Sequence, residues 1–160
     1  MAKSKASPKK QKYQVGQIVA IPLPDKRYAY GKVFNNFDIG VYDFLSEDVE
    51  PVEGVVKKKF LFYNAVTDRA VKNGDFIVIG EEPFPDEESA WAPPMASGVY
   101  PRRPTIGVLH IAHKGELWRA RPEEAAGMDV RDFSQDAELF VDVVVDRLIN
   151  KNHHDYRYQP

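Results

Sequence analysis

Apolar and aromatic residues near the start of the chain gather in three short runs, and turn-forming residues separate them. The runs are Ile18–Leu23, Tyr28–Phe34 and Ile39–Leu45. Their β-branched and aromatic residues favour strands, whereas Pro24-Asp25 and Asn35-Asn36 favour turns. The pattern therefore predicts an antiparallel meander of three strands.

Four later runs have the same strand-like composition: Phe60–Val66, Asp75–Ile79, Thr105–Ala112 and Leu117–Arg121. The last two flank His113-Lys114-Gly115-Glu116, which predicts a hairpin. Gly31 interrupts the second run of the meander, and a glycine inside a strand is typical of a bulge or a tight bend. We predict one bent, mostly antiparallel sheet, or a partly open SH3-like β-barrel, over Gln17–Ala120.

Two short helices are expected after the strands. Pro122–Ala126 begins with proline, has acidic residues in its first turn and precedes Gly127, and all three features favour a helix. The last apolar segment, Leu139–Asn150, is ambiguous, because its valine content favours a strand and its spacing favours a helix. We choose a helix over about Asp142–Asn150. The predicted fold class is α+β, with one or two short C-terminal helices.

Charge is distributed unevenly along the chain. Met1–Lys12 contains five lysines and no acidic residue, whereas 17 basic and 24 acidic residues follow it and leave a net −7 there. Lysines mixed with Ser, Ala and Pro are typical of a disordered segment. We therefore divide the 160 residues into a disordered basic tail (1–13), a single globular domain (14–152) and a C-terminal tail (153–160).

Acidic residues are concentrated in two predicted loops, Ser46–Glu53 and Gly80–Pro94. A run of charge is typical of a solvated loop, but acidic residues beside aromatic ones also form surfaces that bind basic proteins. Prolines continue to Pro104, and their density argues against a helix or a central strand. Under the binding hypothesis, the partner-binding residues are Glu47, Asp48, Glu50, Glu53, Glu81, Glu82, Asp86, Glu87, Glu88 and Trp91.

Candidate catalytic and metal-binding residues are sparse. The chain has no cysteine, which excludes disulfides and thiolate chemistry. His110 and His113 would face opposite sides of a strand, and the same difficulty applies to His153-His154, so we predict no metal site and no cofactor. No serine lies in a nucleophile-elbow pattern and no glycine-rich phosphate loop is present, so we predict no catalytic residue.

The same composition limits the partners that we expect. No apolar stretch approaches the ~20 residues that span a bilayer, and no secretory signal opens the chain, so we expect a cytoplasmic protein without a membrane partner. Direct nucleic-acid binding is disfavoured, because phosphate contacts need clustered Lys and Arg. An acidic surface suits a basic protein instead.

The segment Gly16–Val33, GQIVAIPLPDKRYAYGKV, resembles the start of the immunity protein 26 family of bacterial polymorphic-toxin systems. Shorter similarities follow at Phe76–Gly80, Gly115–Glu124 and Val144–Leu148. The resemblance implies a cytoplasmic, non-enzymatic protein that binds one cognate toxin and occludes its active site. If that toxin is a basic nuclease domain, an acidic protein would take the place of the substrate's phosphates.

A second similarity concerns the first strand. Gly16–Pro24 is similar to the first strand of the PemK-type endoribonuclease toxins, which are small SH3-like barrels. Those toxins carry an Arg-Pro pair in the second strand, where this chain reads Tyr30-Gly31-Lys32-Val33. The likeness therefore argues for a shared architecture without the activity. A PemK-like endoribonuclease toxin and a non-toxin protein-binding module are the alternatives to an immunity protein.

Overall fold

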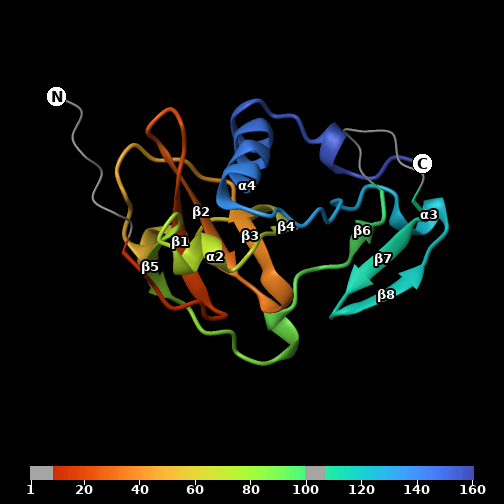
Figure 1. Cartoon of the computed structure of the whole chain (residues 1–160), viewed down its shortest axis with the longest axis horizontal. Helices are drawn as coiled ribbons and strands as arrows, with labels where there is room; N and C mark the ends of the chain where they lie inside the picture. Colours follow the sequence, from red (N-terminus) through yellow and green to blue (C-terminus); the bar gives the residue numbers. More distant parts are fainter. Residues whose placement is uncertain (1–8, 100–106) are drawn as a thin grey trace.

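The first sheet of the computed structural model is a four-stranded antiparallel meander with a fifth strand added at one edge. The structure describes residues 9–99 and 107–160, and the strand order is β4-β3-β2-β1-β5 (Figure 1). The predicted meander is confirmed, and two of its turns hold non-glycine residues in the left-handed region, at Lys26 and Asn36. The strands are β1 (Gln17–Pro22), β2 (Tyr28–Val33), β3 (Asp38–Tyr42), β4 (Phe60–Ala65) and β5 (Ile77–Glu81).

A second, smaller sheet contains the remaining strands in the order β6-β7-β8. These are β6 (Met95–Ser97), β7 (His110–His113) and β8 (Glu116–Arg119). The α+β class with antiparallel sheets is confirmed, but a single sheet over Gln17–Ala120 is wrong, because none of these three strands pairs with a strand of the first sheet. Among the described residues no pairing joins β4 to β5, so the first sheet is open and does not close into a barrel. The beginning of the predicted strand Thr105–Ala112 lies outside the described residues.

The first sheet is buried on both faces, which explains the unbroken apolar run in β1. Ile18 and Ala20 belong to one core cluster, whereas Val19 and Ile21 belong to another on the opposite face. A strand that is covered on both sides has no polar face, so it shows no alternation of polar and apolar residues.

One face is covered by α4 (Ala137–Val144) and α2 (Arg69–Lys72). A π-helical turn, η3 (Val145–Ile149), continues α4. The helix predicted at Asp142–Asn150 exists, but its predicted start is wrong. It begins after Asp136, whose side chain accepts a hydrogen bond from the Leu139 amide at 2.9 Å. That is the N-cap interaction that fixes the start of a helix.

The opposite face of the first sheet is covered by the segment that joins β3 to β4. Its short helix α1 (Val52–Val55) buries Val55 against Ile18, Tyr30 and Tyr42. This segment includes the predicted acidic loop Ser46–Glu53. The loop therefore lies across the sheet, and its apolar residues cover the core.

The two sheets are connected by the segment that follows α3 (Pro122–Ala125). Ala96 of β6 exchanges backbone hydrogen bonds with this segment, accepting from Arg131 and donating to Asp129. Farther on, Ser134 pairs in parallel with Val66, next to β4. Figure 1 shows this segment crossing from the second sheet toward α4. Since β4 and β6 are edge strands, one segment covers both edges and connects the sheets.

Both ends of the described chain pack against this framework. Gln11, in the segment expected to be a basic tail, donates to the carbonyls of Val71 and Phe76 and accepts from the Val78 amide. Tyr156 lies in the C-terminal segment, is buried in the main core, and its carbonyl accepts from the Val130 amide. Residues 1–8 lie outside the description. None of the described helices is long and apolar enough to cross a bilayer.

Candidate functional site

The first acidic loop is attached to the sheet through Tyr30. Its buried phenol oxygen accepts from the Glu50 amide at 2.9 Å and donates to the Asp48 carbonyl at 3.3 Å. The side chains of Glu47, Asp48 and Glu53 are exposed, and Glu50 is half-buried. The backbone of this loop is therefore fixed while its carboxylates face water.

The second acidic loop is held at its start by a buried lysine. The Nζ atom of Lys32 lies 2.9 Å from Oε1 of Glu82 and 4.0 Å from the centre of the Phe84 ring. The Lys32 side chain is only 7% exposed, so its charge needs both the carboxylate and the ring face to offset desolvation. Phe84 also packs on Phe34, with the ring centres 4.9 Å apart. These contacts anchor the loop to the sheet.

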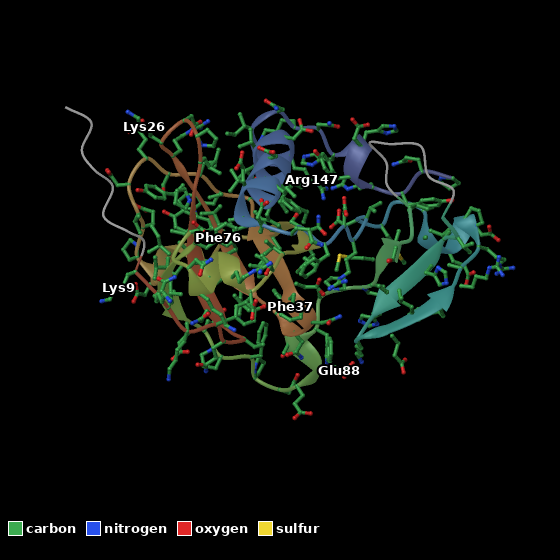
Figure 2. The ribbon with its side chains drawn as sticks, viewed as in Figure 1. Lys9, Lys26, Phe37, Phe76, Glu88 and Arg147 are labelled. Carbon is green, nitrogen blue, oxygen red and sulfur yellow. The ribbon has the colours of Figure 1, made fainter. Side chains whose placement is uncertain are left out.

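The end of the second acidic loop contacts the hairpin of the second sheet. Glu88 forms an ion pair with Lys114 in the β7–β8 turn, and Figure 2 shows Glu88 at the outer edge of this loop. Trp91 is half-buried, and its Cη2 atom lies 3.9 Å from where a Cβ on Gly115 would stand. Within the loop, hydrogen bonds from Ser89 hold the pKa of Asp86 below its ordinary value. Contacts at both ends therefore define the course of the loop.

The structure brings the two acidic loops together only in part. Val52 of α1 approaches within 3.1 Å of where a Cβ on Gly80 would stand. This places Glu53 beside the start of the second loop, which opens at Glu81. The beginning of the first loop lies elsewhere, since Ser46 pairs with Tyr28 at the start of β2. The predicted acidic residues thus follow an extended band rather than one compact rim.

A cleft of about 150 Å³ lies between the two sheets, next to the end of the second acidic loop. Its walls combine apolar and polar side chains from both sheets and from the connecting segment. Its lining residues are Asn36, Asp38, Ala92, Pro93, Met95, Ser97, Ala112, His113, Lys114, Gly115, Glu116, Leu117 and Arg131.

Asp38 is the buried charge of this cleft. It is 5% exposed, and its Oδ1 accepts from Nε of Arg131 at 2.8 Å. Burial raises the pKa of the Asp38 carboxyl, although the positive charge of Arg131 opposes the shift. The other oxygen, Oδ2, accepts no hydrogen bond from any residue that the structure describes. Among the described residues, Arg131 is therefore the counter-charge of this carboxylate.

The backbone beside Asp38 has an unusual conformation. Asn36 and Phe37 both lie in the left-handed region, with φ of 61° and 65°, which non-glycine residues rarely adopt and which costs roughly 1–2 kcal/mol per residue. Arg131 donates from Nη2 to the Asn36 carbonyl at 2.7 Å. One arginine thus holds both the carboxylate of Asp38 and the turn before it.

Sequence reasoning missed this cleft. Asp38 and Arg131 are 93 positions apart, and no local motif marks either residue. The predicted hairpin turn at His113–Glu116 was the only sequence signal for a residue of the cleft. That signal did not indicate that the turn faces the first sheet. In the described ranges, no group of three or more His, Cys, Asp or Glu side chains is placed to hold a metal ion.

An α+β protein with a fixed acidic loop beside an inter-sheet cleft has the features of a binding protein. The model of one family, described as Immunity protein 26, matches residues 14–97. The match covers more than half of the chain, and the chain belongs to this family. It spans the first sheet, both acidic loops and β6, whereas β7, β8, α3 and α4 lie beyond it. No curated protein and no solved structure gave a match.

Proposed function

We propose that this protein is a cytoplasmic antidote that binds one cognate bacterial toxin and covers its active site. Membership of the immunity protein 26 family supports a toxin partner and a binding role without catalysis. A basic nuclease domain is the toxin that fits best. Its cleft must attract phosphates, so an acidic protein surface of matching shape competes for the same site.

One observation carries this proposal: the carboxylates of the second acidic loop divide into two groups. Glu82 and Glu88 form ion pairs with Lys32 and Lys114, whereas Glu81 and Glu87 are exposed and form no ion pair with a described residue. The paired residues hold the loop in place. The unpaired ones present negative charge from a fixed backbone, and a preorganised surface loses less entropy on binding.

The test uses the cognate toxin domain, which is to be identified among the genes that neighbour this one. Co-expression should restore growth, and stopped-flow measurements of the purified pair should show association that slows as salt is added. The variant Glu81→Lys/Glu87→Lys should reduce the association rate at low salt by at least tenfold. Its melting temperature should stay within about 2 °C of the wild type, because both side chains are exposed.

The matched control is Asp43→Lys/Asp75→Lys. It produces the same change in net charge at two exposed positions outside the acidic loops. Association that slows equally in both double variants would show an effect of net charge and contradict a role for the loop. Expression of the protein alone should leave growth unchanged. Arrested growth would instead favour the endoribonuclease alternative.

A further inference from the structure

Residues 153–158, which we call the C-terminal strap, pair with the segment that connects the two sheets. Three backbone hydrogen bonds join the strap to residues 127–130, and one of them runs from the Val130 amide to the Tyr156 carbonyl at 2.8 Å. The other edge of the connecting segment pairs with β6. The strap therefore supports the link between the two sheets from its outer side.

A buried arginine binds the first residue of the strap. Arg147 of η3 is 1% exposed. It donates from Nη1 to Asp129 at 2.8 Å and from Nε to Nδ1 of His153 at 3.3 Å. Its Nη2 atom is buried and has no hydrogen-bond partner among the residues that the structure describes. Because a guanidinium has only donors, Nδ1 of His153 must present a lone pair. His153 is therefore neutral when the strap is in place, and it is one of the acceptors on which a buried cation depends.

Protonation of His153 removes this acceptor. An imidazolium donates from both ring nitrogens and accepts at neither, so a rotation of the ring cannot restore the hydrogen bond. The Nε donor of Arg147 would then be buried without an acceptor, and two positive charges would stand side by side. Both effects destabilise the closed strap and are relieved when His153 moves into water.

The charges around His153 favour its release over a new ion pair. Arg147 faces it from η3, and Arg157 and Lys151 belong to its own segment. Burial, followed by these positive charges, lowers the pKa of His153. Asp129 opposes the shift from the connecting segment, but its Oδ1 already accepts from Arg147 and lies 3.9 Å from Nε of Arg157. Two further carboxylates near the strap accept hydrogen bonds from the Asn152 side chain: Asp146 and Asp155.

We propose that His153 is an acid-sensitive latch, whose protonation releases the C-terminal strap from the connecting segment while the first sheet stays folded. A terminal segment opens without the rest of the fold when few contacts hold it. Release exposes the buried ring of Tyr156 and leaves residues 127–130 without their outer partner. The latch is closed above the ordinary pKa of histidine, 6.5, and opens as the pH falls through the lowered pKa of His153. This device acts in the isolated protein and does not depend on the toxin.

An NMR titration of the full chain in acid tests the latch. As the imidazole shift of His153 reports its protonation, the order parameters of the Tyr156 and Tyr158 amides should fall from about 0.85 to below about 0.6, the range of a flexible backbone. The resonances of β1 and β2 should keep their native positions. A strap that stays ordered after His153 is protonated would overturn the proposal. Loss of the strap and the first sheet in one transition would overturn it as well.

Three variants identify the group that controls the strap. His153→Gln keeps an acceptor that does not titrate, so its strap should remain ordered at the pH that releases the strap of the wild type. His153→Lys removes the acceptor and adds a permanent charge, so its strap should be released even at pH 7.5. His154→Gln, at the exposed neighbouring position, should behave as the wild type. Release of the His153→Gln strap at the same pH as the wild type, or a closed strap in His153→Lys, would overturn the assignment.

Discussion

Asp129 binds the buried Arg147 and the edge of the first sheet at the same time. Its Oδ1 accepts from Nη1 of Arg147 at 2.8 Å, and its Oδ2 accepts from the Tyr63 amide at 3.1 Å. Arg147 is 1% exposed and lies 4.4 Å over the Phe62 ring. Figure 2 shows it on the side of α4 that faces the second sheet. The pair therefore connects η3, which continues α4, with β4 and the segment that joins the sheets.

Removing Asp129 should cost much more stability than removing the whole pair. Asp129→Ala leaves a buried guanidinium without its counter-charge, and such losses are about 3–5 kcal/mol. Arg147→Met in the same chain removes the uncompensated charge and fills most of its volume, so the double variant should recover at least half of the loss. Urea unfolding of the wild type, both single variants and the double variant measures the coupling. If the losses of the two single variants simply add in the double variant, the coupling between Asp129 and Arg147 is contradicted.

Stability should fall in mild acid because of His153. Its Nδ1 faces Nε of Arg147 at 3.3 Å, and burial together with Arg147, Arg157 and Lys151 lowers the pKa of His153 below its ordinary value of 6.5. Below pH 6.5 the His153 side chain binds a proton in the unfolded chain, whereas in the folded protein it stays neutral until the pH reaches its lowered pKa. The contribution of His153 is therefore complete above about pH 6.5 and is lost as the pH falls through the lowered pKa.

Thermal unfolding between pH 8 and pH 5 tests this dependence. His153→Gln keeps an acceptor for Arg147 but does not titrate, so its melting temperature should fall less over this range than that of the wild type. His154→Gln is the matched control, since His154 is the exposed neighbour. A pH profile of His153→Gln that follows the wild type would show that other groups control acid unfolding.

The absence of a side chain at Gly31 is explained by close packing rather than by a β-bulge. The expected bulge is wrong, because β2 pairs in continuous register with β1 and with β3 at Gly31. A Cβ at this position would stand 2.6 Å from Cγ2 of Ile39 and 3.3 Å from the Gly40 carbonyl oxygen. Gly31→Val should therefore destabilise the protein by about 1–3 kcal/mol through overpacking, although valine favours strands.

Gly54→Ala is the control for this substitution. Gly54 lies in α1, and nothing comes within 4 Å of its Cβ position. Alanine should stabilise that helix by up to about 1 kcal/mol. Chemical denaturation of both variants gives the comparison. A neutral Gly31→Val would mean that Ile39 moves aside without cost.

The meander was predictable because its signals are local. Proline, aspartate and asparagine mark the turns, and strands buried on both faces are apolar throughout. The second sheet was harder to foresee, because β6 has only three residues and follows Pro93-Pro94. Its partner in the connecting segment forms isolated pairs, such as Ala96 with Val130. Such pairs produce no periodic pattern in the sequence.

The start of α4 and the cleft were not predicted, for two different physical reasons. Asp136 followed by Glu138 is a recognisable N-cap signal. This local signal marks the helix start, although the valines that follow favour a strand. The contact between Asp38 and Arg131 has no such signal. It depends on how the two sheets meet, and that arrangement is set by contacts between residues distant in sequence.

The two tryptophans of the chain, Trp91 and Trp118, have different surroundings. Trp91 packs its ring against the β7–β8 turn and directly precedes Ala92 and Pro93, which line the cleft. Trp118 lies in the edge strand β8 and is 43% exposed. Trp91→Ala should therefore lower the free energy of unfolding by about 2 kcal/mol, whereas Trp118→Ala should cost less than about 1 kcal/mol.

The same variants test whether Trp91 serves mainly to position the acidic loop. Trp91→Ala loosens the loop where it meets the second sheet, so stability should fall and association with the toxin should slow through the displaced carboxylates. Trp118→Ala should leave the association rate unchanged. If Trp91 is instead an anchor that contacts the toxin directly, Trp91→Ala would leave stability unchanged and increase only the dissociation rate. Measuring unfolding and toxin kinetics on both variants separates positioning from direct contact, because only positioning links lower stability to slower association.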